Sequence, residues 1–262
     1  NFKKTFFFLI KKQFHSFSFK KETILISVMA ANNETGVIYP IKQIAEIAHQ
    51  HGVLFHSDAT QAVGKMQINV IEDEIDLLNF SGHKLYGPKG VGALYVRHNH
   101  DLPKPLAQIQ GGGHEKGMRS GTLNVPGIVG FGKAAELRLA EMKLEAQRLE
   151  VLRNRLEKGL LEIPNTFLNG SFEHRLPHVT NIAFGGVEGD ELLKKVNQKV
   201  AVSSGSACTS ISPKPSHVLQ VMGLNADLGR ASIRFSLGKN TSDSDIELTL
   251  DWVKKVVLDF RK

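Results

Sequence analysis

Strands and helices alternate in the first half of this chain, and this alternation constrains the fold more than any other feature. The run TILISVMA at residues 23–30 is β-branched and nearly all apolar, which is typical of a strand buried on both faces of a parallel sheet. Apolar side chains then recur at helical spacing from Ile41 to Ala48, Gly52 ends that helix, and residues 53–56 form the next strand. Such a unit predicts an open α/β sheet that binds ligands beyond the carboxyl ends of its strands.

The later elements divide the chain into two parts. Further strands are expected at residues 76–80, 91–96, 181–184, 200–203 and 232–235. We therefore predict a large domain with a mostly parallel sheet at residues 23–140, and a smaller α+β domain at residues 141–262.

Three helices are predicted in the second half. The longest runs from near Pro126 to about Leu161, and its later part carries an apolar stripe of four leucines, Leu149, Leu152, Leu156 and Leu160. A short helix is expected at residues 190–197 and a last one from Asp243 onward. Ser242 and Asp245 have the spacing of a capping box that opens this last helix.

The positive charge of the chain is concentrated at its start. The formal net charge is +7, but residues 1–21 hold six lysines and no acidic residue, which leaves +1 for the remainder. The remainder is nearly neutral, so we expect no nucleic-acid partner. The apolar run at residues 6–10 is too short to span a bilayer, and we expect no membrane partner.

Residues 1–22 are unlike the rest of the chain. They contain seven of its 15 phenylalanines and no initiator methionine, arginine or small-residue cleavage site. We expect an atypical segment that does not belong to the domain, and a signal or transit peptide is the alternative.

The single cysteine, Cys208, rules out an internal disulfide framework and indicates a reducing compartment. Two histidine pairs, His49 with His51 and His98 with His100, have no carboxylate or thiol at ligand spacing. We expect these histidines to be solvated and the chain to bind no metal.

A lysine and an aspartate follow two neighbouring predicted strands. The turn HSDATQ places Asp58 after the first strand, and SGHK places Lys84 after the second. An aldehyde cofactor such as pyridoxal 5'-phosphate (PLP) needs a lysine for its Schiff base and a carboxylate that keeps its ring nitrogen protonated. Gln61 can donate to the phenolate oxygen, and Ser81 and His83 can reach the phosphate or steady the Schiff base. A lone lysine in a Gly-rich loop is usually just solvated, but its pairing with Asp58 favours a PLP site.

Two further residues suggest chemistry. Cys208 lies in the small, polar segment AVSSGSACTS, where it is either a nucleophile or a structural cysteine. Arg234 is a charge within the predicted strand SIRFS, and its guanidinium matches a substrate carboxylate in bidentate geometry. An internal ion pair is the alternative for Arg234.

Together these motifs resemble the cysteine desulfurases of the class V aminotransferase group, fold-type I PLP-dependent transferases that supply sulfur for iron–sulfur clusters. The resemblance covers about residues 23–262, through the motifs ANNETG, HSDATQAVGK, SGHKLYGPKGVGALYVR, GGGHEKGMRSGTLNVPGIVG, VSSGSACTS and ASIRFSLG. It implies that Lys84 is the Schiff-base lysine, that Asp58 pairs with the ring nitrogen, and that Gln61 meets the phenolate oxygen. It also implies that Ser81 and His83 lie near the phosphate.

The same resemblance implies the other site residues and the partners. Asn33 would lie near the cofactor and the substrate carboxylate, and Thr122 would reach the phosphate of the other subunit's cofactor, which implies a homodimer. Cys208 would take sulfur from L-cysteine as a persulfide, leaving L-alanine, and hand it to an iron–sulfur scaffold protein. A bacterial cytoplasm and a mitochondrial matrix both suit such an enzyme.

Family members carry a Gly-Thr-rich phosphate cup, a ring-stacking histidine and several strands before the region matched here. We expect the large domain of this chain to be incomplete, because residues 1–22 hold no such motif. One alternative is therefore a truncated, inactive relative that at most dimerises or binds a scaffold. Another alternative is a selenocysteine lyase, which would use the same PLP cofactor in the same way.

Overall fold

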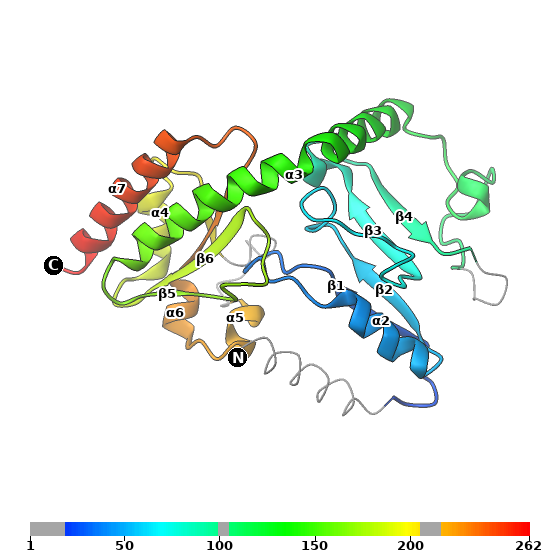
Figure 1. Cartoon of the computed structure of the whole chain (residues 1–262), viewed down its shortest axis with the longest axis horizontal. Helices are drawn as coiled ribbons and strands as arrows, with labels where there is room; N and C mark the ends of the chain where they lie inside the picture. The colour runs from blue at the N-terminus through cyan, green and yellow to red at the C-terminus, as the bar shows by residue number, and fades with distance from the viewer. Residues whose placement is uncertain (1–18, 99–104, 205–215) are drawn as a thin grey trace. The chain divides into compact units, whose positions relative to one another are not determined.

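The computed structural model describes residues 19–98, 105–204 and 216–262 (Figure 1). They form two compact units. One contains the described residues up to Ala30 together with Pro40–Ala140, and the other contains Ala31–Tyr39 together with Glu141–Lys262. The segment Ala31–Tyr39 thus groups with the second unit, although the first unit supplies the chain on both sides of it.

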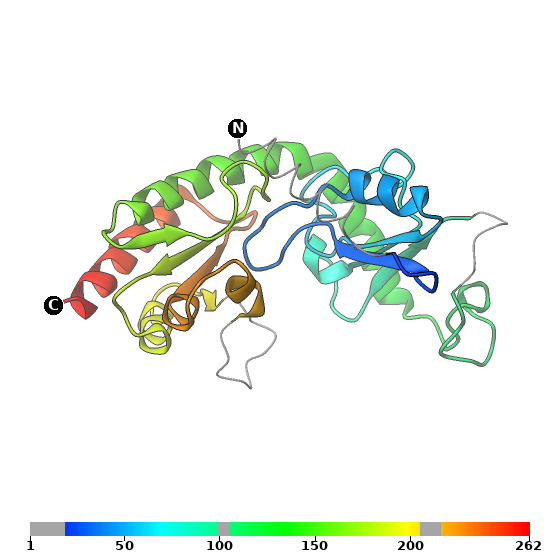
Figure 2. The same cartoon turned by 90° about the horizontal axis from the view of Figure 1, so that it is seen from below.

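The first unit is built on a four-stranded sheet in the order β1-β2-β3-β4. Its strands are β1 (Leu25–Met29), β2 (Leu54–Asp58), β3 (Leu77–Ser81) and β4 (Gly92–Val96). The pairs β1-β2 and β2-β3 are parallel, and β4 is antiparallel to β3. The helix α2 (Ile41–Gln50) connects β1 to β2 and lies along one face of the sheet (Figure 2). The predicted α/β class with a mostly parallel sheet is confirmed.

The expectation that residues 23–30 are buried on both faces is wrong for the described residues. Because α2 covers one face of the sheet, the side chains of β1 alternate between half-buried on that face and exposed on the other, where Leu25 and Met29 lie. The strand also lies at the edge of the sheet. In β2 the buried side chains are Phe55 and Ser57, which point to the face that α2 covers. The opposite face, which carries exposed Leu94 of β4 as well, has no such cover among the described residues.

The helix α3 (Val125–Leu161) begins in the first unit and ends in the second. Its 37 residues confirm the predicted long helix. The four leucines of its predicted apolar stripe are all buried, and they belong to one core cluster with Ile182, Phe184, Ile233 and Phe235. The stripe therefore packs on the sheet of the second unit.

That second sheet is antiparallel, in the order β5-β6-β8-β7. Its strands are β5 (Thr166–Leu168), β6 (Val179–Phe184), β7 (Ser203–Ser204) and β8 (Ser232–Ser236). The strand predicted at residues 200–203 is wrong in extent, since Ser203 and Ser204 are the described residues of that region that pair with β8. The three-residue β5 was not predicted, because so short a segment has no readable alternation.

The remaining helices of the second unit are α4 (Gly189–Val196), α5 (His217–Val221), α6 (Ala226–Arg230) and α7 (Asp243–Phe260). The predicted capping box of α7 is confirmed: Asp245 N–H donates to Ser242 Oγ at 3.3 Å, and Ser242 N–H donates to Asp245 Oδ2 at 2.8 Å. The five-residue helices α5 and α6 were not predicted. Among the described residues, no helix combines the length and apolar character that a bilayer crossing needs.

Candidate functional site

Two polar strand ends lie side by side in the first unit. Asp58 ends β2 and Ser81 ends β3, and these strands are parallel with Asp58 opposite Asn79 in the register. Ala59 N–H extends the pairing by donating to the Asn79 carbonyl at 2.9 Å. Both carboxyl ends therefore reach the same edge of the sheet, where ligands bind in open α/β folds.

The residues after Ser81 form a short 3-10 helix, η1 (Gly82–Leu85), which carries His83 and Lys84. Gly82 N–H donates to the Val91 carbonyl at 2.9 Å, and Gly87 N–H donates back to Gly82 at 3.0 Å. A Cβ at Gly82 would lie 3.1 Å from Phe131 of α3, from Val91 and from the Pro88 carbonyl. Only glycine fits this close approach without displacing its neighbours, so the backbone of the turn is fixed against α3 and β4.

The side chains that the turn displays are available for a ligand. His83 and Lys84 are exposed, and neither forms a hydrogen bond or ion pair with another residue in the described part of the chain. Asp58 is also exposed, and within the same residues its carboxylate accepts one hydrogen bond, from Thr60 N–H at 2.9 Å. An exposed amine and an exposed carboxylate that follow two adjacent parallel strands fit a cofactor that has an aldehyde and a basic ring nitrogen. Half-buried Gln61 follows in the same turn.

A polar ladder continues from Asp58 along the same face of the sheet. His56 lies two residues before Asp58 in β2, and its Nδ1 is 2.7 Å from Ser27 Oγ of β1. Its Nε2 is 2.8 Å from Asn79 Oδ1 of β3. These three residues therefore join three neighbouring strands behind the proposed ring-nitrogen partner. None of the three was predicted from the sequence, in which the two-residue spacing of His56 and Asp58 is the one sign that their side chains share a face of the sheet.

The second unit holds Asn33 and Arg234. Arg234 is half-buried in β8, and its Nη1 donates to the Asn33 carbonyl at 2.8 Å. Asn181 of β6 is fully buried and donates to the Glu34 carbonyl at 3.1 Å. Ile38 N–H also donates to the His174 carbonyl. The backbone of the ANNETG segment is thus held by Arg234 and Asn181 of the second sheet.

Thr122 is exposed in the loop before α3. The loop is organised locally: Ser120 Oγ accepts from Gly113 N–H at 3.2 Å, and Arg119 Nη1 donates to the Gly121 carbonyl at 2.9 Å. Cys208 lies outside the described residues, so its placement stays a prediction.

The expectation that His49 is solvated is wrong. Its Nε2 lies 2.8 Å from Asp76 Oδ2 and its Nδ1 lies 3.3 Å from Glu74. Asp76 is buried and also accepts from Phe55 N–H at 2.8 Å, so His49 fastens the end of α2 to the start of β3. His51 packs edge-on against Phe19. In the described part of the chain, no three or more His, Cys, Asp or Glu side chains are grouped so that they could hold a metal ion.

Comparison with known families agrees with this geometry. Residues 11–249 match the family model described as "Aminotransferase class-V". The chain belongs to the class V aminotransferase family. Families of this class use PLP, which suits the arrangement of Lys84 and Asp58. "Cysteine desulfurase IscS" of Actinobacillus succinogenes is 51% identical over 243 residues, which cover 93% of this chain and 60% of that protein.

Other class V relatives give the same picture. "Cysteine desulfurase IscS" of Anaeromyxobacter dehalogenans is 53% identical over 232 residues, which cover 88% of this chain and 57% of the relative. Among solved structures, a NifS-like protein from Rickettsia africae superposes with a TM-score of 0.82 at 32% identity, covering 94% of this chain and 65% of that one. DndA from Streptomyces lividans has a TM-score of 0.69 at 34% identity, covering 84% and 62%. The fold-type I prediction is confirmed, and the chain spans about 60% of the length of the curated relatives it matches.

Proposed function

We propose that this chain functions in a PLP-dependent cysteine desulfurase, which converts L-cysteine to L-alanine and leaves the sulfur as a persulfide on Cys208. The observation that carries the proposal is Lys84, which is exposed and forms no ion pair within the described residues, in the turn after β3, while Asp58 ends the adjacent parallel strand β2. Similarity to proteins named cysteine desulfurase supports this choice among the reactions of the class V family.

The residues of the first unit would hold the cofactor. When bound, PLP draws electrons away from the substrate Cα and so weakens the bonds around it. The Lys84 amine is the group that binds the aldehyde and that can carry a proton to or from the substrate. The Asp58 carboxylate keeps the ring nitrogen protonated, and the His56 ladder fixes the strand that carries Asp58. Gln61 donates to the phenolate oxygen.

Four further residues complete the proposed site. Ser81 and His83 contact the phosphate, and His83 beside Lys84 also helps proton transfer. Asn33 and Arg234 bind the substrate carboxylate, which a guanidinium matches in bidentate geometry.

Cys208 is the proposed sulfur acceptor. Its thiolate attacks the sulfur of L-cysteine, the bond from that sulfur to the substrate Cβ breaks, and the released carbon takes up a proton to give L-alanine. The sulfur remains as a persulfide on Cys208, so no external oxidant or reductant is needed. An iron–sulfur scaffold protein is the proposed acceptor in the next step, and a reducing bacterial cytoplasm or mitochondrial matrix would keep the thiol free.

A homodimer is part of the proposal. The first half of α3 exposes an apolar stripe at helical spacing, Val125, Ile128, Val129 and Leu139, which begins three residues after Thr122. Exposed apolar stripes of this kind mark interaction surfaces. A second copy on this stripe would bring Thr122 to the partner's phosphate.

The first test is the covalent attachment of PLP. We expect purified chain mixed with PLP to gain the visible absorbance of a lysine-bound cofactor, and reduction with borohydride followed by peptide mass mapping should place the adduct on Lys84. Lys84→Ala should lose the adduct, whereas Lys89→Ala, which removes an exposed lysine of the same loop, should keep it. An adduct that persists in Lys84→Ala would contradict the assignment.

The second test follows the sulfur. With L-cysteine, alanine should form together with a persulfide on Cys208, and an added reducing thiol should release that sulfur as sulfide. Cys208→Ser should abolish the persulfide while keeping the PLP adduct. An adduct without turnover would favour a chain that binds PLP but is inactive. Faster turnover of selenocysteine than of cysteine would favour a selenocysteine lyase.

A further inference from the structure

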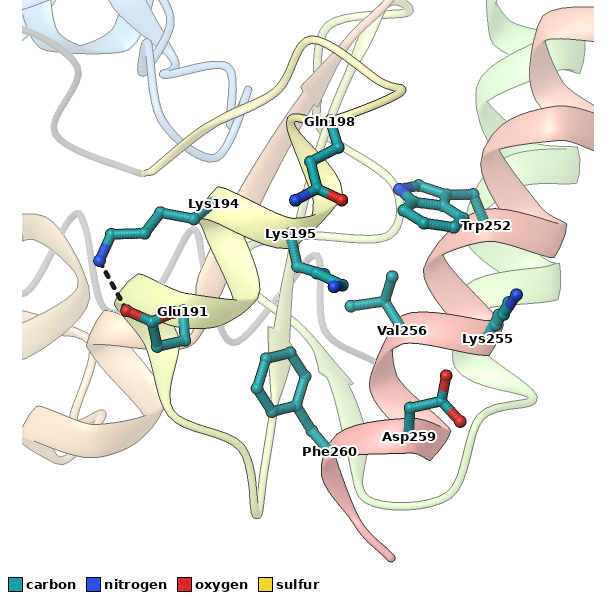
Figure 3. Close-up of a pocket in the computed structure, with 9 residues that line it drawn as sticks. All are labelled: Glu191, Lys194, Lys195, Gln198, Trp252, Lys255, Val256, Asp259 and Phe260. Carbon is teal, nitrogen blue, oxygen red and sulfur yellow. Dashed lines mark hydrogen bonds and ion pairs between the residues drawn. The ribbon is translucent and has the colours of Figure 1, made fainter.

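A groove lies between α4 and α7 of the second unit (Figure 3). Its volume is about 680 Å³, which is within the range of sites that hold a peptide side chain or a small ligand. No residue of the proposed PLP site lines it. Its lining has two parts, an apolar floor and a rim of charged side chains.

The floor offers apolar surface to a partner. Trp252, Val256 and Phe260 all belong to α7 and point into the groove (Figure 3). Trp252 is half-buried, and its Nε1 donates to the Val196 carbonyl of α4 at 3.2 Å, which fixes the indole ring. Phe260 is exposed although it is apolar and aromatic. An apolar side chain seated here would cover both rings and gain free energy from the buried area.

The rim is positively charged because its two acidic residues are already neutralised. Lys194 Nζ is 2.6 Å from Glu191, and Lys262 Nζ is 2.8 Å from Asp259. Lys195 and Lys255, one from each wall, form no ion pair within 4.0 Å of an acidic residue in the described part of the chain. The groove therefore presents two unpaired ammonium groups above its apolar floor.

Two more observations describe this positive charge. Lys199 Nζ lies 4.4 Å from the centre of the Trp252 ring, which adds a third cation beside the floor. The pKa of Asp259 is lowered, first by the hydrogen bond and charge of Lys262 and then also by the charges of Lys255 and Lys195. The charges of Lys195 and Lys255 are therefore both felt at Asp259, on the rim of the groove.

Helix stability explains only part of this arrangement. Lys194 and Lys195 lie in the last turn of α4, where cations interact favourably with the helix dipole. Lys255 lies inside α7, five residues before its end, where that interaction is weak. A role in binding accounts for Lys255 and for the exposed Phe260 as well.

We propose that the α4–α7 groove docks an acidic segment of another protein, with an apolar side chain on Trp252 and Phe260 and carboxylates on Lys195 and Lys255. Charge complementarity selects the acidic partner, and the apolar floor selects a peptide over a simple anion. This proposal does not rest on the PLP chemistry.

The groove contains its own probe, because Trp252 is the single tryptophan of the chain. We would titrate the full chain with a synthetic helical peptide that carries Glu and Leu on one face, and follow Trp252 emission. The emission should change on binding, and the affinity should fall as salt is added. A peptide with Lys in place of Glu should bind at least about tenfold more weakly. Equal binding of the two peptides would overturn the proposal.

Charge reversal on the protein gives the matched test. The double variant Lys195→Glu and Lys255→Glu should bind the acidic peptide at least about tenfold more weakly than the wild-type chain. The control, Lys254→Glu, reverses an exposed lysine of α7 outside the groove and should bind nearly as well as the wild-type chain. Equal loss in both variants would show a general charge effect and overturn the proposal, as would tighter binding of a single-stranded RNA oligonucleotide that is lost in the double variant alone. Far-ultraviolet circular dichroism would check that every variant is folded.

Discussion

The two units differ in how they cover their sheets. In the second unit β6 is buried along its whole length: Ile182 and Phe184 face the helical core, and Asn181 faces the segment Ala31–Tyr39. In the first unit the strands β1 and β4 carry exposed Leu25 and Leu94 on one face. The stable core of the described chain therefore lies in the second unit, whereas the proposed cofactor residues Lys84 and Asp58 project from the first.

The buried polar groups of the second unit differ from the proposed site residues of the first. In the second unit Glu157 is buried and accepts hydrogen bonds from both Arg175 and Thr180. Nearby Arg153 is buried too, and burial, followed by the charge of Arg175, lowers its pKa. In the first unit Lys84 is exposed and unpaired within the described residues. The buried Glu157 and its partners stabilise the second unit, whereas the exposed Lys84 is available to bind a ligand.

The largest expected effect is a core truncation in each unit. Phe184 and Phe55 are both fully buried, in β6 and β2. Phe184→Ala should lower the free energy of unfolding by about 4–5 kcal/mol, because the cluster around it is closed, and Phe55→Ala by about 3 kcal/mol, because the sheet of the first unit has an open face. Urea unfolding with hydrogen exchange of β2 and β6 would measure both. An equal or larger loss of unfolding free energy in Phe55→Ala would contradict the inference that the core of the second unit is the more closed of the two.

The buried ion pair should give the next largest effect. Glu157→Gln leaves the charge of Arg175 buried without its partner and should lower the free energy of unfolding by about 3 kcal/mol. Trp252 fluorescence during urea unfolding would report it, since that residue lies in the same unit. The matched control, Glu136→Gln, removes an exposed pair with Lys133 and should cost less than about 0.5 kcal/mol. Similar losses in the two variants would show that burial of the Glu157 pair is unimportant.

A smaller effect tests the contact of the second sheet with the ANNETG segment. Asn181→Ala removes the donor to the Glu34 carbonyl and a hydrogen bond from Asn169, and should cost about 2 kcal/mol. Hydrogen exchange should rise at the amides of residues 33–37 more than elsewhere in the unit. Asn240→Ala, at an exposed position, serves as the control and should leave this exchange unchanged.

The smallest effect concerns the start of α7. Ser242→Ala removes the helix cap and should cost about 1 kcal/mol. The hydrogen bonds from Ser242, backbone first, lower the pKa of Asp245 in the folded chain. The carboxylate therefore stabilises the fold above pH about 4 and loses this contribution as the pH falls through its folded-state pKa. Ser242→Ala removes the hydroxyl donor and keeps the backbone N–H, so NMR titration should show the pKa of Asp245 rising only part of the way toward its ordinary value. A full return to the ordinary value would contradict the assignment of the backbone hydrogen bond as the larger cause.

Much of the fold could be predicted because its signals are local. The leucine stripe of α3, the capping box of α7 and the strand, helix, strand unit all depend on residues a few positions apart. The candidate site could be proposed from the sequence for the same reason, since Asp58 and Lys84 each come at or just after the end of an apolar strand. The exposed face and edge position of β1 could not be predicted from local pattern, because they depend on which strands and helices become its neighbours.

The sequence by itself determined the class of fold and the family motifs, and it named the side chains that we propose hold PLP. The tertiary structure decided which of the other polar residues meet. Arg234 donates to Asn33 across 201 positions, and His56 joins Ser27 to Asn79. No local pattern records such partners, because they are brought together by sheet register and core packing. The tertiary structure also gave the α4–α7 groove, since its two walls come from helices that only packing sets side by side.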